Sequence, residues 1–197
     1  MRKRLFVAIP LPNAVKDALE DVQKRTKIKE ARPVRGREGS QRASASNGAS
    51  WTPKENLHIT VYFIGWVEDS RVPEVAERMR RVCAGTSPFA LTFQEAVFGP
   101  PQRTPYMVWG IFEENTRYET LARAMGSALN ELSGEEDTRK PIPHVTLARF
   151  THPFLPHVKL HQPKIAPFEI SSCELMESHL SRSGPTYTIL ESFSFGK

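Results

Sequence analysis

The sequence predicts an α+β domain built from two related lobes. Short apolar runs that alternate with polar residues indicate strands, and longer apolar stripes at helical spacing indicate helices. A strand, a helix and a second strand occur in that order at 4–64 and again at 106–150, and each second strand carries a His-x-Thr-x motif. We therefore expect one domain, 1–197, whose two motif strands face each other across a groove.

The first lobe is predicted from a buried strand and an amphipathic helix. Residues 4–9 are mostly apolar, and Pro12 and Asn13 open a helix whose apolar stripe ends near Lys27. The further elements expected here are a short strand at 50–52, the motif strand at 57–64, which Gly65 ends, and a helix at 71–84.

The second lobe contains the clearest helix of the chain. Asn115 is its expected N-cap and Gly134 its expected end. The helix has one apolar stripe, formed by Tyr118, Leu121, Ala122, Met125, Ala128, Leu129 and Leu132. Strands are expected at 89–98, 106–112 and 144–150, followed by a surface loop at 151–167 and a hairpin of 168–180 with 186–195.

Residues 28–49 interrupt the first lobe. They are polar and basic, are rich in Gly, Ser and Arg and show no periodicity, so we expect a mobile loop inserted within the domain. Two interpretations stay open, a flap that contacts nucleic acid and a solvated loop without a role. The segment contains five basic side chains: Lys29, Arg32, Arg35, Arg37 and Arg42.

The composition is that of an ordinary globular protein, with 39% hydrophobic and 25% charged residues. A formal net charge of +5 favours phosphate-bearing partners, and simple solubility explains it as well. The two cysteines, Cys83 and Cys173, fall in a helix pattern and a strand pattern, which predicts reduced, packed thiols and a cytoplasmic protein. The apolar run at 5–9 is too short for a signal peptide, and we expect no membrane association.

The two motifs carry the chemistry. Because side chains alternate along a strand, His58 and Thr60 share one face, and so do His144 and Thr146. Two imidazoles around one phosphate suit in-line displacement at phosphorus, since histidine exists in both protonation states near neutral pH. One ring takes a proton from water, the other protonates the leaving oxygen, and the hydroxyls bind the non-bridging oxygens.

A metal site is not expected within the motifs. Each motif supplies one good ligand, and neither contains a cysteine or a carboxylate to complete a site. We expect no cofactor. The other four histidines, which match no zinc pattern, are expected at the surface or in the hairpin: His152, His157, His161 and His179.

At these motifs the sequence resembles the two-histidine phosphoesterase superfamily. It is most similar to the RNA 2′,3′-cyclic phosphodiesterases, formerly described as 2′-5′ RNA ligases. The paired motifs are specific to the superfamily, and the flanking pieces point to this branch. The matching pieces are Trp51 and the segments 5–10, 55–60, 63–65, 143–149, 175–178 and 183–187.

The resemblance implies a bilobal fold of two antiparallel sheets with outer helices and pseudo-two-fold symmetry. It also implies hydrolysis of a 2′,3′-cyclic phosphate at an RNA 3′ end to a 2′-phosphate, without metal. By that resemblance His58 is the proton donor, His144 is the proton acceptor, and Thr60 and Thr146 bind the phosphate. Arg149 reaches the phosphate or the RNA, with a surface ion pair as the alternative.

Tyr187 is a further substrate-binding candidate at the rim of the groove. The implied partner is RNA with a cyclic phosphate end, tRNA fragments among the substrates, acted on by a monomer. Two segments depart from the family pattern, 28–49 and 151–167. Two other functions stay open: an enzyme for a small cyclic nucleotide, an ADP-ribose cyclic phosphate or a 2′-5′ linkage, and an RNA-binding module without turnover.

Overall fold

The computed structural model describes residues 1–26, 49–100, 104–133, 140–151, 158–181 and 184–196. The predicted inserted loop, 28–49, lies outside the described residues except for Ala49. The structure therefore does not test either role considered for its five basic side chains. Gly134, His152 and His157 lie outside the described residues as well.

In the described part of the chain, antiparallel strands form one long sheet and one short sheet. The order in the long sheet is β10-β9-β1-β3-β7-β6-β5, with β2 paired to β7, and β4 and β8 form the short sheet. The strands are β1 (Arg2–Pro10), β2 (Ala49–Trp51), β3 (His58–Glu68), β4 (Phe89–Leu91), β5 (Phe93–Gly99), β6 (Met107–Phe112), β7 (His144–Phe150), β8 (Phe168–Ile170), β9 (Ser172–Ser181) and β10 (Gly184–Ser194). The α-helices are α1 (Asn13–Arg25), α2 (Val72–Ala84) and α3 (Thr116–Ser133).

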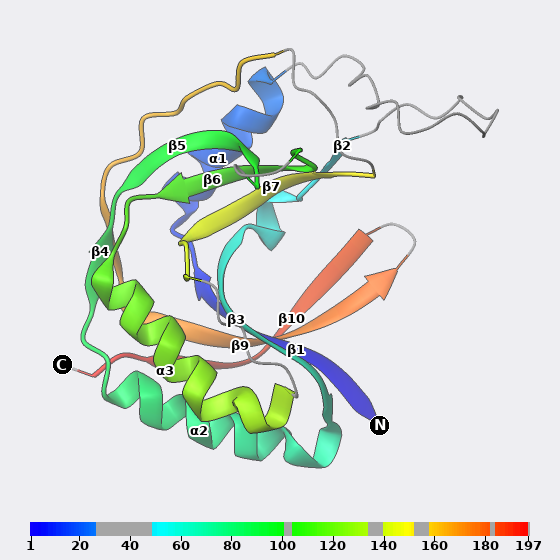
Figure 1. Ribbon diagram of the computed structural model, residues 1–197, viewed down its shortest axis with the longest axis vertical. Helices are drawn as coiled ribbons and strands as arrows, with labels where there is room; N and C mark the ends of the chain where they lie inside the picture. The colour runs from blue at the N-terminus through cyan, green and yellow to red at the C-terminus, as the bar shows by residue number, and fades with distance from the viewer. Residues whose placement is uncertain (27–48, 101–103, 134–139, 152–157, 182–183, 197) are drawn as a thin grey trace.

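The long sheet bends where the two motif strands meet. β3 and β7 share one bridge, Ile59 to Val145, whereas β1 with β3 and β6 with β7 pair over most of their lengths. In Figure 1, β10, β9 and β1 form the lower half of the curled sheet, and β5, β6 and β7 form the upper half. The predicted α+β class with antiparallel sheets is confirmed. The motif strands are hydrogen-bonded neighbours, a closer arrangement than two strands that face each other across a groove.

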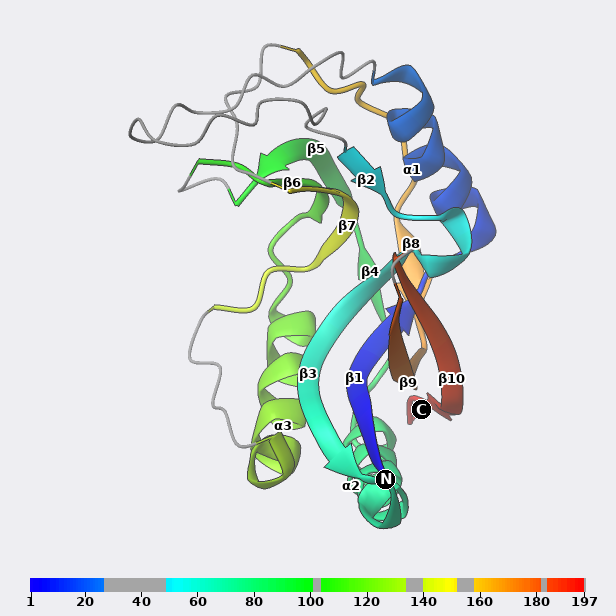
Figure 2. The ribbon, with the colours of Figure 1, turned by 90° about the vertical axis from the view of Figure 1, so that its right-hand side faces the viewer.

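The predicted strand, helix, strand repeat is present twice, as β1-α1-β3 and as β6-α3-β7. Each helix packs on the motif strand of the other unit, α1 on β7 and α3 on β3. Figure 2 shows α1 beside β2 and β7 in the upper half and α3 beside β3 in the lower half. This exchange ties the two halves of the sheet together and fixes the motif strands next to each other.

The clearest predicted helix begins where the sequence places it. The backbone N–H of Tyr118 donates to Asn115 Oδ1 at 3.0 Å, which satisfies one of the N–H groups that a first helical turn leaves unpaired. Tyr118 is buried, and its hydroxyl donates to the carbonyl oxygen of Thr60 at 3.0 Å. The start of α3 therefore holds the first motif strand from the core side.

Two predicted strands are each divided in the structure. The segment 89–98 divides at Thr92 into β4 and β5, and 168–180 divides at Ser171 into β8 and β9. The carbonyl oxygens at both breaks accept hydrogen bonds from the other elements, Thr92 from Glu113 N at 2.9 Å and Ser171 from Phe195 N at 2.8 Å. At these points the chain leaves one sheet for the other, which apolar alternation alone does not reveal.

The two cysteines are buried and free, as predicted. Cys83 on α2 and Cys173 on β9 also form a hydrogen bond with each other, and this bond together with burial raises the pKa of the Cys173 thiol. The described residues include no helix that is long and apolar enough to cross a membrane.

Candidate active site

The four motif side chains lie on one face of the sheet, which we call the motif face. Ile59 and Val145 form the bridge between β3 and β7, and both are fully buried on the opposite face. In the same antiparallel register His58 stands opposite Thr146, and Thr60 stands opposite His144. Directly opposed residues have Cβ atoms about 5 Å apart and diagonal ones about 7–8 Å apart, which leaves room for one phosphate between the two imidazoles.

The two imidazole rings are held in the same way. His58 Nδ1 lies 2.7 Å from the carbonyl oxygen of Asn56, and His144 Nδ1 lies 2.8 Å from the carbonyl oxygen of Ile142. A carbonyl only accepts, so Nδ1 donates in both rings and Nε2 is the nitrogen that can serve a substrate. His58 Nε2 also lies 3.1 Å from Thr60 Oγ1, which joins the imidazole and hydroxyl of the first motif.

The electrostatic surroundings of His58 favour its neutral form. Burial lowers the pKa of His58 to about 4. The smaller effects of nearby Lys16, His144 and Arg149 are part of this lowering, while the hydrogen bond to the Asn56 carbonyl opposes it. At neutral pH the free protein therefore carries an uncharged His58. A phosphate anion within about 4–6 Å acts in the opposite direction and favours the imidazolium.

One extra residue in β7 decides where Arg149 points. Opposite β6, Thr146 pairs with Trp109 and Ala148 with Val108, so Leu147 is a β-bulge. Two residues beyond the bulge, Arg149 lies on the motif face although its offset from His144 is odd. Simple alternation along a strand would place Arg149 on the face opposite the motif.

Each motif strand has such a bulge three residues after its histidine. In β3 the extra residue is Val61, because Ala8 pairs with Thr60 and Val7 with Tyr62. A side chain of the packed helix satisfies a carbonyl at each bulge. Tyr118 on α3 donates to Thr60 O at 3.0 Å, and Gln23 on α1 donates through Nε2 to Leu147 O at 3.1 Å. The pseudo-two-fold relation thus extends from the motifs to the bulges, while the supported carbonyls differ by one position, Thr60 in one strand and Leu147 in the other.

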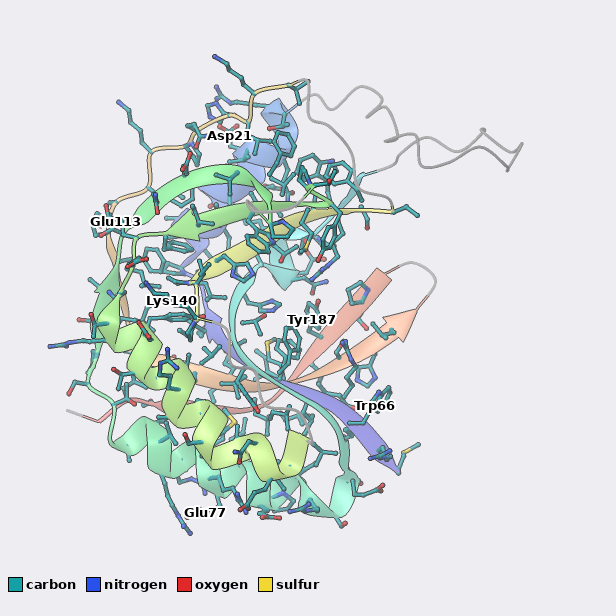
Figure 3. The ribbon with its side chains drawn as sticks, in the orientation of Figure 1. Asp21, Trp66, Glu77, Glu113, Lys140 and Tyr187 are labelled. Carbon is teal, nitrogen blue, oxygen red and sulfur yellow. The ribbon has the colours of Figure 1, made fainter. Side chains whose placement is uncertain are left out.

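Arg149 and Tyr187 both lie close to His58. Burial raises the pKa of Tyr187 and lowers that of His58; the Arg149 charge opposes the first shift and adds to the second, and its Nη1 lies 3.1 Å from Met107 Sδ. The Tyr187 ring meets the His58 ring edge-on at 5.1 Å between centroids, and Figure 3 shows Tyr187 between the two halves of the sheet. The structure therefore brings together all six candidate site residues predicted from the sequence.

The structure adds aromatic supports that sequence reasoning did not find. Phe6 packs on His58 with ring centroids 5.1 Å apart, and Trp109 packs on His144 at 4.3 Å. Trp109 Nε1 is buried without a hydrogen-bond partner among the described residues. The alternation of residues 106–112 predicts a strand at Trp109. It gives no sign that this ring would lie against the second histidine.

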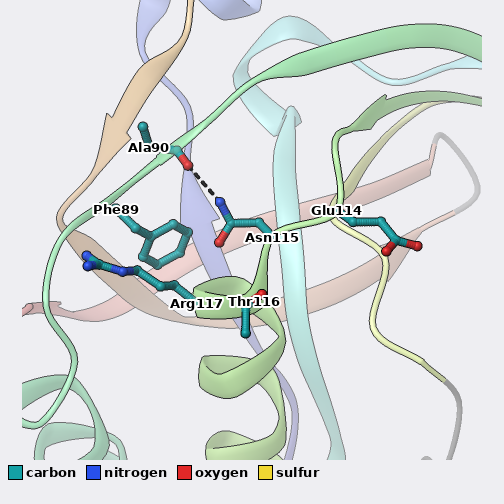
Figure 4. A pocket seen from close by; sticks show the side chains of 6 residues that line it. All are labelled: Phe89, Ala90, Glu114, Asn115, Thr116 and Arg117. Carbon is teal, nitrogen blue, oxygen red and sulfur yellow. Dashed lines mark hydrogen bonds between the residues drawn. The ribbon is translucent and has the colours of Figure 1, made fainter.

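Other candidate features lie away from the motif face. A pocket of about 320 Å³ lies at the start of α3, where Asn115 Nδ2 donates to Ala90 O at 2.9 Å (Figure 4). Two of the polar side chains that line it serve the helix itself: Asn115 caps it, and Arg117 Nη1 donates to Pro88 O at 2.9 Å. His161 pairs with Asp21 at 3.2 Å and His179 with Glu177 at 3.7 Å, in accord with their predicted surface positions. Among the described residues no group of three or more His, Cys, Asp or Glu side chains is arranged to hold a metal ion.

Comparison with known proteins decides the family. The family model described as LigT like Phosphoesterase matches residues 35–109, which include the first motif. The RNA 2′,3′-cyclic phosphodiesterase of Thermus thermophilus is 31% identical over 205 residues, which cover 97% of this chain and 89% of that relative. The chain belongs to the LigT-like phosphoesterases. The relationship predicted from the paired motifs is thereby confirmed.

Further similarities of this LigT-like phosphoesterase agree with that assignment. The RNA 2′,3′-cyclic phosphodiesterase of Thermotoga maritima is 28% identical, over 75% of this chain and 80% of that relative. The crystal structure of TT0787 from Thermus thermophilus superposes with a TM-score of 0.73 at 27% identity and covers 98% of this chain and 99% of that chain. The similarity to that structure therefore extends over 98% of this chain.

Proposed function

We propose that this LigT-like phosphoesterase hydrolyses the 2′,3′-cyclic phosphate at an RNA 3′ end and leaves a 2′-phosphate. The observation that supports this most strongly is the Ile59–Val145 bridge, which sets both motif pairs on one face in matching register. The names of the curated relatives, RNA 2′,3′-cyclic phosphodiesterase, favour the same reaction.

In the proposed mechanism the two histidines act from opposite sides of one phosphorus atom. Nε2 of neutral His144 takes a proton from water as the water oxygen forms its bond to phosphorus. The bond between phosphorus and the 3′ oxygen breaks, and Nε2–H of His58 gives its proton to that oxygen. Hydroxyl groups of Thr60 and Thr146 donate to the non-bridging oxygens, where negative charge must be stabilised.

The donor role requires His58 to become protonated when substrate binds. The pKa of His58 lies near 4 in the free protein because the ring is buried. The negative charge of the cyclic phosphate raises this pKa in the complex, because it stabilises the imidazolium. In this proposal the substrate itself helps to charge the acid, and His144 remains the base.

Arg149 and Tyr187 complete the proposed site. The Arg149 guanidinium, turned onto the motif face by the Leu147 bulge, donates to the phosphate oxygens. Tyr187 fixes the orientation of the His58 ring through its edge-on contact. No step calls for a metal ion, since the proton transfers and the charge stabilisation are all assigned to side chains.

We further propose that the protein acts as a single-domain monomer in the cytoplasm, with tRNA fragments among its substrates. The buried, free thiols of Cys83 and Cys173 support a reducing compartment. The basic excess of the chain, +5, supports a polyanionic substrate.

Product analysis in EDTA tests the proposed reaction. An RNA with a 3′-terminal 2′,3′-cyclic phosphate should be converted to the 2′-phosphate at the same rate with and without EDTA. An ADP-ribose cyclic phosphate and a 2′-5′-linked dinucleotide assayed in parallel should turn over more slowly. A 3′-phosphate product or loss of activity in EDTA would contradict the mechanism, and a preference for either competing substrate would contradict the proposed specificity.

A further inference from the structure

Two large aromatic side chains of β3, Phe63 and Trp66, remain exposed beyond the motif. Each keeps 56% of its surface accessible. The proposed reaction at His58 uses neither of them. Single exposed apolar residues are common, but an aromatic group continuous with a candidate active site marks a surface for binding.

Two β-bulges bring these aromatic side chains to the motif face. Phe63 is five residues beyond His58, an odd offset that simple alternation would send into the core. The extra residues Val61 and Ile64 restore Phe63 and Trp66 to the same face as His58. Gly65 follows the second bulge with a φ of 83°, a conformation that glycine adopts without strain. The expectation that Gly65 ends the strand is therefore wrong, since β3 continues to Glu68.

The exposed aromatic side chains belong to rows of side chains that run across four strands of the sheet. The pairing partners in β1 are Phe6 for Phe63 and Arg4 for Trp66. Continued through β9 to β10, this register gives two rows of side chains on the motif face. The first row is Phe63, Phe6, Met176 and Ile189, and the second is Trp66, Arg4, Ser178 and Tyr187.

Arg4 supplies positive charge in the second row, where it stands between Trp66 and Tyr187. Its Nη1 donates to Ser178 Oγ at 3.4 Å, and its charge lowers the pKa of Tyr187 against the larger effect of burial. Figure 3 shows Tyr187 and Trp66 along the half of the sheet that contains β10, β9, β1 and β3. Aromatic faces with a neighbouring cation are the combination that binds single-stranded nucleic acid, because bases stack and phosphates pair.

The distance between Trp66 and the motif decides which part of a substrate this surface fits. Trp66 pairs with Arg4 and His58 pairs with Pro10, six residues apart on β1. At a rise of about 3.3 Å per residue the two positions lie about 20 Å apart along the backbone of β1. A nucleotide whose cyclic phosphate lies at His58 does not reach that far, so the occupant at Trp66 belongs to a longer chain.

We propose that Trp66, with Arg4 beside it and Phe63 on the way to the motif, binds an upstream nucleotide of single-stranded RNA whose 3′ end lies at His58. The inference rests on the proposed function for the position of that end. It assigns recognition of the upstream strand to the half-sheet of β10, β9, β1 and β3. Stacking tolerates every base, so the preference is for strand length and single-strandedness rather than sequence.

Two substrates and one binding measurement test this inference. kcat/KM is measured for a tetranucleotide with a 3′-terminal 2′,3′-cyclic phosphate and for 2′,3′-cyclic AMP. Trp66→Ala should lower the value for the tetranucleotide by about 5- to 150-fold, the range for loss of one base stack, and leave that for cyclic AMP within twofold. Tyr106→Ala, which removes an exposed aromatic ring outside the two rows, should leave both values unchanged.

Binding of the tetranucleotide 2′-phosphate, measured by fluorescence anisotropy of a 5′ label, tests the surface independently of turnover. Trp66→Ala should weaken this binding by the same factor, and Arg4→Gln should weaken it with a smaller dependence on salt. Unchanged binding, or equal losses for cyclic AMP and the tetranucleotide, would overturn the inference. Failure of the wild-type protein to hydrolyse either substrate would instead refute the proposed function, and the anisotropy result would still decide the role of Trp66.

Discussion

Replacement of either motif histidine should reduce kcat by about 10²–10⁴-fold, the usual contribution of one general acid or base. Glutamine is the suitable replacement at His58 and His144, because it retains a polar group near the motif threonine and does not transfer protons. The loss should appear in kcat rather than in KM, since the proton transfers belong to the transition state. Single-turnover hydrolysis of an RNA with a cyclic phosphate end measures it.

The double variant, with glutamine at both His58 and His144, shows whether the two histidines act in one reaction or contribute independently. If both rings serve the same phosphorus, removing the second histidine should cost much less than removing the first. His179→Gln is the matched control, because this exposed imidazole pairs only with a neighbouring carboxylate on β9 among the described residues and should retain full activity. Turnover within threefold of wild type in either single variant would refute the paired acid and base scheme.

Arg149→Met should lower kcat/KM by about 10- to 150-fold, the worth of a hydrogen bond to a charged group. Methionine preserves much of the aliphatic stem, so the change removes the guanidinium rather than the packing. Arg149→Lys should recover only part of the loss, because an ammonium does not donate in the planar, bidentate geometry of arginine. Steady-state kinetics on the cyclic-phosphate RNA provide the measurement.

The matched control for Arg149 is Arg123→Met. Arg123 is an exposed arginine on α3 that pairs with Glu119 at 2.8 Å, one turn away on the same helix. It should not change kcat/KM. Equal kinetic effects of the two substitutions would show that Arg149 acts only through the net charge of the protein, contrary to the proposed contact.

Much of the fold follows from local patterns in the sequence. The α3 stripe and Asn115 predict a capped amphipathic helix, and the cap is present. The repeated motif predicts that Ile59 and Val145 face the core, and both are fully buried. These predictions succeed because helical periodicity, capping and strand alternation depend on residues close together in the chain.

The register of the long sheet could not be predicted in the same way. Bulges at Val61 and Leu147 reverse the alternation, so Phe63 and Arg149 reach the motif face despite odd offsets from their histidines. A bulge depends on pairing with a distant strand and on distant donors such as Gln23, which bonds the Leu147 carbonyl. For the same reason the ring contact of Trp109 on His144 was not apparent from the sequence.

The proposed mechanism requires that two imidazoles bind one phosphate through Nε2. It is tested most directly by ¹⁵N NMR of the histidine side chains during titration with a nucleoside 2′-phosphate. In the free protein the His58 signal should titrate near pH 4, because burial lowers its pKa. Bound phosphate should raise that pKa and shift His58 and His144 Nε2 with a single midpoint, while His161 and His179 stay unchanged. A chemical-shift change at only one motif histidine, or two separate midpoints, would contradict the proposed mechanism.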